Sequence, residues 1–415
     1  MEVPELHERV TPERASLAAD RSRIAEIEAQ IHALRAEQQL VQDRLDAYTY
    51  PVLTLPPEII AEVFIHFLPA YPRHPPRAGL LSPLTLGQIC RTWREIALLT
   101  PKLWRAVSIL LPSRTRREQL HVAELMLARS GSSLLTASIT SYFVGAERAF
   151  IGLIAPHCER LEHLQLCASE LSGLDSVKTN LSSLRTLMVG LSTIGFNDPG
   201  PGIFLTAPLL RKVALKAYTS IWLPILPWSQ LSVLSLDYIR IQECATVLNI
   251  ATNIVFCRLA VESRGNMERP PIAPLRHLET LVLRVHLALD PNVNVEGLCS
   301  TLTLPALREL QVAEVFLLPD PTANLGQLLS RSGCSPAKIH IMDSEQPLEV
   351  YCQAIPSVAF HQGPQRLIHH IRPQGPNKEL PDIGEVESLD WRNEDVEFED
   401  SGPWWDHEDL EDDDS

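Results

Sequence analysis

The densest group of side chains that could bind a metal consists of His157, Cys158, His163 and Cys167. Structural zinc sites usually show paired ligands at a short, fixed spacing, and the intervals in this group are irregular. His163 and Cys167 also fit an alternating strand pattern, which accounts for them without a metal. We therefore expect no metal site and no bound cofactor.

The sequence contains none of the common catalytic or nucleotide-binding motifs. The patterns Gly-x-x-x-x-Gly-Lys-Ser/Thr, Gly-x-Gly-x-x-Gly, His-Glu-x-x-His and Gly-x-Ser-x-Gly are all absent. No pairing of a nucleophile with a base is visible either. We expect a protein that is not an enzyme, and an undetected enzyme is the weaker alternative.

The charge is concentrated at one end of the chain. The 415 residues carry a net charge of −15, and residues 385–415 hold 15 of the 51 acidic residues and only one of the 36 basic ones. The remainder is nearly neutral, so we expect no nucleic-acid partner. No apolar run is long enough to cross a bilayer, so we expect no membrane contact. The eight cysteines have no repeating spacing and the chain has no secretory-type start, which favours a cytoplasmic and/or nuclear location.

Residues 17–48 show a heptad pattern. Eight of the ten core positions are apolar or aromatic, and charged residues of both signs flank them. The core positions are Leu17, Asp20, Ile24, Ile27, Ile31, Leu34, Gln38, Val41, Leu45 and Tyr48. The pattern predicts a helix that either pairs with a second copy as a coiled coil or folds back on the rest of the chain.

Residues 53–104 contain two apolar segments with helical spacing. An extended Leu53-Thr54-Leu55 is expected to precede Pro56 and Pro57, and proline suits the first turn of a helix. The first helix ends at Pro69, and a second helix carrying Trp93 is expected over residues 86–97. About fifty residues cannot bury such broad apolar faces internally, so the segment needs a partner surface. The alternative is a helical hairpin buried in a larger domain.

The order of three motifs in this segment resembles the F-box. They are Leu-Pro-Pro-Glu-Ile-Ile at 55–60, Cys-Arg-Thr-Trp-Arg at 90–94 and Leu-Trp at 103–104. The F-box docks substrate receptors onto the Skp-type adaptor of cullin–RING ubiquitin ligases. By this resemblance the adaptor-binding residues are Leu55, Pro56, Pro57, Ile59, Ile60, Phe64, Ile89, Trp93 and Trp104. Residues 70–83 form a proline-rich insertion that a shorter F-box lacks, and this insertion either lies at the surface or weakens adaptor binding.

After Trp104 the pattern Leu-x-x-Leu-x-Leu recurs with apolar substitutions. Clear copies begin at residues 161, 184, 210, 231, 256, 278 and 307, and weaker ones begin at 336, 134 and 104. A period of 21–29 residues predicts a solenoid, because each short strand can bury its apolar side only against its neighbours. The pattern resembles leucine-rich repeats, although the usual Asn or Cys after the last Leu is missing. An α/β fold with strands at similar intervals is the alternative, but the spacing leaves little room for crossover helices.

Residues between the repeat leucines should face the opposite, concave side of the strands. Solenoids tend to bind partners there, although any such row must also be moderately polar to face solvent. The candidate substrate-facing residues are His163, Gln165, Thr186, Met188, Lys212, Lys216, Asp237, Arg258, Arg284, Glu309, Gln311 and His340.

These segments predict a mixed α/β chain with six parts. They are a flexible start (1–15), an amphipathic or coiled-coil helix (16–49), an F-box-like domain (51–105), a leucine-rich-repeat-like solenoid (106–345), a cap and linker (346–378) and an acidic disordered tail (379–415). The combination resembles the F-box proteins common in mushroom-forming fungi. This resemblance implies a substrate-recognition subunit of a cullin–RING ubiquitin ligase, with a Skp-type adaptor, an unknown protein substrate and a homodimer through 17–48 as partners. A scaffolding protein unconnected with ubiquitin is the alternative.

Overall fold

The computed structural model describes residues 10–46, 51–76, 79–111, 116–141, 146–168, 180–191, 203–216, 222–262, 271–285, 295 and 297–362. The acidic tail predicted over 379–415 and the flexible start lie outside or almost outside these ranges. The chain divides into two compact units, 1–63 and 64–415, and each is described by itself.

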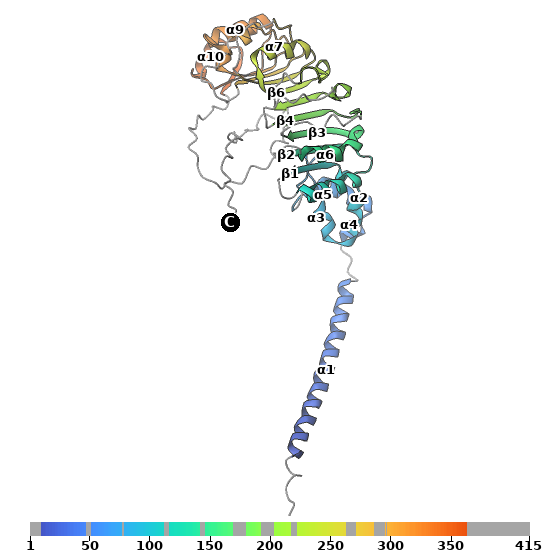
Figure 1. The fold of residues 1–415 in the computed structure, drawn as a ribbon. Helices are drawn as coiled ribbons and strands as arrows, with labels where there is room; N and C mark the ends of the chain where they lie inside the picture. Colours follow the sequence, from blue (N-terminus) through green and yellow to red (C-terminus); the bar gives the residue numbers. More distant parts are fainter. Residues whose placement is uncertain are drawn as a thin grey trace, which may run out of the picture. The chain divides into compact units, whose positions relative to one another are not determined.

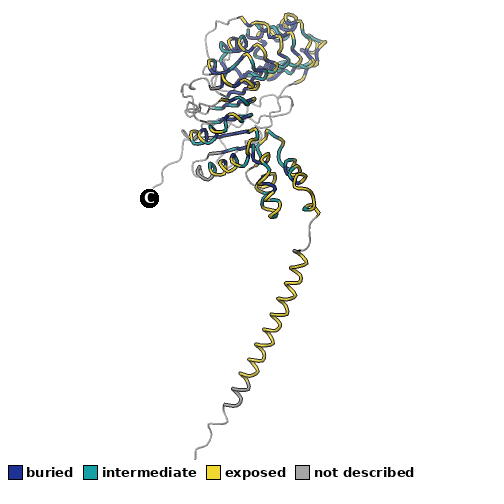
Figure 2. The backbone as a smooth tube through the Cα atoms, turned by 90° about the vertical axis from the view of Figure 1, so that its right-hand side faces the viewer, coloured by how far each residue is buried: buried dark blue, intermediate teal, exposed yellow. Residues whose placement is uncertain are grey.

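The first unit consists mainly of helix α1 (Val10–Asp46), which confirms the helix predicted over 17–48. Every side chain described along α1 is exposed (Figure 2). A 3-10 turn, η1 (Pro51–Thr54), follows where an extended segment was expected. The Thr54 hydroxyl donates to the Pro51 carbonyl at 2.7 Å and closes this turn, which explains the difference. Helix α2 (Pro57–Phe67) then starts at a proline and spans the division between the units.

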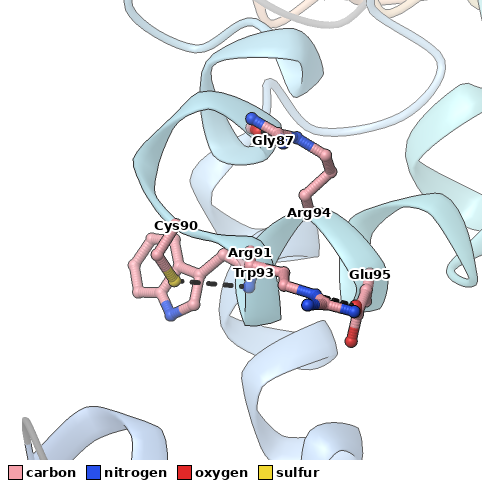
Figure 3. A network of polar contacts seen from close by, with 6 residues as sticks. All are labelled: Gly87, Cys90, Arg91, Trp93, Arg94 and Glu95. Carbon is pink, nitrogen blue, oxygen red and sulfur yellow. Dashed lines mark hydrogen bonds and ion pairs between the residues drawn. The ribbon is translucent and has the colours of Figure 1, made fainter. Parts of the chain in front are cut away.

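The second unit opens with two short helices where one was expected. They are α3 (Pro83–Ile89) and α4 (Arg91–Leu98), and the turn η2 (Pro101–Trp104) follows them. The break falls at Cys90, whose backbone is extended. Its thiol caps α4 by accepting a hydrogen bond from the Trp93 N–H at 3.4 Å (Figure 3). The Arg94 side chain bridges the break by donating to the Gly87 carbonyl at 2.7 Å.

Eleven parallel strands then form one sheet in strict chain order (Figure 1). They are β1 (Ala106–Leu111), β2 (Leu135–Ser141), β3 (Leu161–Ala168), β4 (Thr186–Leu191), β5 (Lys212–Lys216), β6 (Val233–Arg240), β7 (Phe256–Glu262), β8 (Thr280–Val285), β9 (Glu309–Ala313), β10 (Lys338–Met342) and β11 (Ala359–Gln362). The first ten coincide with the predicted repeats, weak copies included. Strand β11 was not predicted, because Ala-Phe-His-Gln lacks the leucine pattern.

The repeat leucines form the core of this sheet. In the register of adjacent strands, Leu164, Leu187, Val213, Leu234 and Cys257 are neighbours, and all are buried. Fully burying such a side chain contributes about 1.5–3 kcal/mol. The predicted alternation between an apolar side and an opposite side is therefore confirmed.

Helices and 3-10 turns lie between many of the strands. The described ones include α5 (Arg116–Arg129), α6 (Ala146–Ile154), η3 (Ala155–Arg160), η5 (Ile203–Thr206), η7 (Trp228–Gln230), α7 (Ile241–Ile250), α8 (Leu298–Thr301), η8 (Glu314–Leu317), α9 (Pro321–Ser332) and α10 (Leu348–Ala354). Apolar residues of these segments belong to the same core as the strand leucines. The unit is thus a mixed α/β structure whose strand arrangement is compatible with a solenoid.

Two arginines tie neighbouring repeats together through helix ends. The Arg160 guanidinium donates to the Leu127 carbonyl at 3.2 Å and to the Ser133 carbonyl at 3.1 Å. Arg331 likewise donates to the Leu302 carbonyl at 2.8 Å and to the Cys299 carbonyl at 2.6 Å. Both arginines satisfy carbonyls at or just after the ends of the preceding helices α5 and α8, which lack partners within the helix.

A buried carboxylate organises the last repeats. Glu314 accepts hydrogen bonds from the Tyr351 hydroxyl, from the Ser344 hydroxyl at 2.8 Å and from the Glu345 N–H at 2.6 Å. Burial raises the pKa of Tyr351, and the adjacent Glu314 raises it further, so the phenol stays protonated as the donor. The network links η8 (Glu314–Leu317) to α10, the helix that precedes β11.

Removing one donor from this network should destabilise the protein. Tyr351→Phe leaves the buried Glu314 short of a partner, and we expect a loss of about 1–3 kcal/mol in the free energy of unfolding, measured by urea denaturation. The exposed Glu349 on the same helix provides the control. Glu349→Gln should change stability by less than about 0.5 kcal/mol. Equal losses in the two variants would contradict a structural role for the network.

Candidate interaction surfaces

The predicted adaptor-binding residues of the first unit are mostly exposed. Leu55, Pro56 and Pro57 are exposed, as is Ile59 on α2, at 50%. Val63, one turn further along α2, is 52% exposed. Ile60, in contrast, is buried, so it cannot contact another protein directly in this conformation.

Among the predicted adaptor-binding residues of the second unit, some are exposed and others are buried. Ile89 is 57% exposed, whereas Phe64 and Trp104 are buried. The rings of Phe64 and Trp93 pack with centroids 4.9 Å apart. The Trp104 indole N–H donates to the Ala97 carbonyl at 2.8 Å, and the Arg129 guanidinium lies 4.8 Å from the Trp104 ring centroid. Phe64 and Trp104 therefore hold the helical segment together, which agrees with the packing role that the resemblance implies for Trp104, while adaptor contact by Phe64 stays a prediction.

Trp93 is neither fully exposed nor fully buried. Its side chain is half-buried, and its indole N–H has no hydrogen-bond acceptor among the described residues (Figure 3). An unsatisfied buried donor costs about 1–3 kcal/mol. The sequence pattern predicted Trp93 as a site residue, but it could not show that the indole N–H lacks an acceptor.

Further apolar side chains on the short helices, or next to their ends, are exposed. Leu99, just after α4, is 83% exposed, and Leu98, Leu84, Leu81 and Leu80 are exposed as well. The predicted set omitted all five, because only positions that match the family motif were included. Their presence could be detected in the sequence as leucines at the ends of the helices.

All twelve candidate substrate-facing residues lie on one side of the sheet, which we call the polar face. The register places them in three rows opposite the leucine rows. The first row contains His163, Thr186, Lys212 and Glu309; the second contains Gln165, Met188, Arg258, Gln311 and His340; the third contains Lys216, Asp237 and Arg284. Lys212 is exposed, Gln165 and Asp237 are buried, and the other nine are half-buried. The prediction that these side chains share one face is confirmed, whereas their role in binding stays a prediction.

The insertion over 70–83 contacts this face at β3. The Tyr71 hydroxyl donates to the Glu162 carboxylate at 3.0 Å, and its ring meets the His163 ring edge-on at a centroid distance of 5.5 Å. The Arg105 guanidinium lies over the Tyr71 ring, 3.8 Å from the centroid. Tyr71 therefore attaches the insertion, most of whose described residues are exposed, to the repeats. The effect of the insertion on adaptor binding stays a prediction.

Burial is the main cause of the pKa shifts of Tyr71 and His163. It raises the pKa of Tyr71 to about 12, and the Glu162 carboxylate adds to the shift. Burial also lowers the pKa of His163 to about 4, against the opposing effect of Glu162, so the imidazole is neutral at pH 7. Arg185 completes the cluster by pairing with Glu162 at 3.0 Å. A neutral ring packed beneath a phenol serves packing and not charge recognition.

Other contacts on the polar face join neighbouring strands. The Arg258 guanidinium lies 3.5 Å from the Asp237 carboxylate, and both side chains are mostly buried. Near the end of the sheet the His340 and His361 rings stack at 5.0 Å, and His340 lies 3.9 Å from Glu309. Charged and polar side chains therefore alternate on this face with apolar ones such as Val233 and Val282.

The residues considered for metal binding have other partners. Cys158 is buried, and its thiol donates to the Ile154 carbonyl at 3.7 Å, while His157 contacts Arg160 at 3.2 Å. Within the described ranges, no group of three or more His, Cys, Asp or Glu side chains is arranged to hold a metal ion. Among the helices of those same ranges, none has the length and apolarity of a membrane span.

Loss of the Tyr71 anchor should release the insertion. We expect Tyr71→Ala to speed tryptic cleavage after Arg73 by about tenfold, since losing about 1.4 kcal/mol of local stability raises the open population by that factor. Leu80→Ala, at an exposed position of the same insertion, is the control and should leave the rate unchanged. Similar cleavage rates in the wild type and in Tyr71→Ala would show that the anchor does not hold the loop.

Comparison with known proteins gives no independent assignment: no protein-family model matches the sequence, and no curated protein shows significant similarity to it.

Proposed function

We propose that this protein is a substrate-recognition subunit of a cullin–RING ubiquitin ligase. In this proposal, residues 51–105 are an F-box-like module that binds a Skp-type adaptor. The sheet within residues 106–345 is a leucine-rich-repeat-like solenoid whose polar face binds the target protein. The protein itself performs no chemistry, and ubiquitin transfer is left to other subunits.

The observation that carries the proposal is that α2 has two apolar sides. Ile60 and Phe64 form one side and are buried. Ile59 and Val63 form the other, four residues apart, and are half exposed. A helix that needs only to pack against its own chain has no use for a second apolar side, whereas a helix that also binds a partner does. The exposed Ile89 at the end of α3 and Leu99 just after α4 are two further apolar side chains open to a partner.

Target binding is assigned to the polar face because of its size and variety. Its rows run across neighbouring strands about 4.8 Å apart and present hydroxyl, amide, imidazole and charged groups together. Extended faces of this kind are the usual binding surfaces of repeat proteins. The part over β3 is occupied by Tyr71, so the surface for a target begins at β4.

The same anchor favours a second candidate function. Tyr71 ties the insertion to the repeats, which is what a scaffolding protein with a permanently packed helical segment would need. In that case the exposed apolar residues would bind a partner unconnected with ubiquitin.

The adaptor assignment can be tested by charged substitutions on the exposed positions. Ile59→Glu and Ile89→Glu should each weaken capture of a purified Skp-type adaptor by at least about tenfold, because a carboxylate would have to be buried without a partner. Leu205→Glu, at a position on η5 that is 52% exposed, is the matched control and should bind normally. Circular dichroism would establish that all three variants are folded.

Two outcomes would count against the ligase assignment. One is an absence of adaptor binding by the wild-type protein, which would leave the scaffolding function. The other is unchanged capture by both variants, which would move the adaptor contact away from α2 and α3.

We also propose that α1 pairs with α1 of a second copy. Most of its heptad positions are apolar, and the apolar ones that the structure describes are exposed. An isolated amphipathic helix of this length gains stability mainly by covering its apolar stripe. Pairing would give the receptor two target-binding surfaces and raise its avidity.

Polar substitutions in this stripe should shift the protein from dimer to monomer. We expect Ile24→Asp together with Ile31→Asp to produce a monomer in sedimentation equilibrium, because two charges would enter the seam. Ala29→Asp introduces the same charge outside the heptad core, and that variant should remain dimeric. A wild-type protein that sediments as a monomer would instead support a helix that folds back on its own chain.

A further inference from the structure

The polar face carries an excess of positive charge. Five cations and two acids lie in its three rows. The cations are Lys212, Lys216, Arg258, Arg284 and Lys338, and the acids are Asp237 and Glu309. Arg240 and Glu262, next along β6 and β7, add one charge of each sign. The face therefore has a net charge of about +3 within a folded part that is nearly neutral overall.

These cations are placed to act on a ligand lying along the face. Lys212 is exposed, and Lys216, Arg258, Arg284 and Lys338 are half-buried. Asp237 is mostly buried beside Arg258, so its charge is partly balanced within the sheet. An occupant of this surface should be acidic.

The chain itself supplies an acidic segment. Residues 385–415 contain 15 acidic residues and one arginine, and they follow the last strand of the same sheet. We propose that this acidic tail binds the polar face of its own chain between β5 and β10. The inference does not depend on the adaptor assignment, because it uses only the sheet and the tail.

The length of the connection allows this contact. Strand β11 ends at Gln362, so 22 residues separate it from Glu385. As a flexible chain, 22 residues have a root-mean-square span of about 26 Å. Lys212 on β5 lies six strands from β11, about 29 Å at the usual strand spacing. The tail therefore reaches the cations at an effective concentration in the millimolar range.

A tail held mainly by charge would act as a competitor for targets. A protein target would have to displace it, which favours targets with acidic segments of higher affinity or with added apolar contacts. Salt should weaken the intramolecular contact, because exposed charges are screened beyond about 8 Å at physiological ionic strength.

Carbodiimide cross-linking of the full chain tests the proposal, because this reagent joins a lysine to a carboxylate in direct contact. The chain has six lysines: Lys102, Lys178, Lys212, Lys216, Lys338 and Lys378. Lys212, Lys216 and Lys338 lie on the polar face, whereas the exposed Lys102 lies on η2 and serves as an internal control.

We expect peptide mass spectrometry to find links from 385–415 to the three face lysines at least about tenfold more often than to Lys102, with a loss of most links when salt is raised from 0.05 to about 0.5 M. Arg284→Glu should reduce the links to Lys216 and Lys338, while Arg276→Glu, at an exposed turn before β8, should not.

Three results would overturn the proposal. They are an absence of links to the face, links to Lys102 as frequent as those to the face, and links found only between chains in a mixture of light and heavy isotope-labelled protein. The last result would assign the tail to the face of a second copy.

Discussion

No strand of this sheet can bury its own apolar residues, and this constraint shapes the rest of the molecule. Leu164, Leu187 and Val213 are buried only because adjacent strands keep the same register. A shift of one residue would turn each leucine onto the polar face and each polar residue into the core. The polar face is thus a consequence of the leucine rows: once the core positions are fixed, the residues between them must share the opposite side.

The ends of such a stack pose a separate problem, because each terminal repeat has a neighbour on one side only. At the first end, Trp104 packs under Arg129 of α5, and its indole N–H is satisfied within the helical segment. At the other end, the buried Glu314 ties η8 to α10 and leads into β11. The two ends therefore use different chemistry, an aromatic cluster at one and a carboxylate network at the other.

The periodic parts of the chain could be predicted and the non-periodic contacts could not. Ten strands follow from Leu-x-x-Leu-x-Leu, since the spacing alone fixes the face that each residue occupies. Strand β11 lacks that pattern and forms by pairing with β10. The break at Cys90 depends on a thiol that accepts from the Trp93 N–H, a local bond with no marked sequence signal.

Tyr71 lies 91 residues from its partner Glu162, and no local pattern predicts a contact over that distance. On α2 the apolar spacing was clear, but it could not tell the buried pair Ile60 and Phe64 from the exposed pair Ile59 and Val63.

The distribution of charge follows from the same architecture. Acids placed in the sheet would have to be desolvated beside one another on closely spaced strands, which is costly unless cations accompany them, as Arg258 accompanies Asp237. A long acidic segment is therefore accommodated at lower cost in residues 385–415, outside the repeats. This separation leaves the sheet with its cations and the tail with a net charge of −14, although the folded part as a whole is almost neutral. Under the proposed contact between the tail and the face, a ligand of the polar face would have to compete with the oppositely charged residues 385–415. If the face binds a target as proposed, selectivity would depend on what that target offers beyond negative charge. The half-buried Met188 and Gln311 lie on the same face.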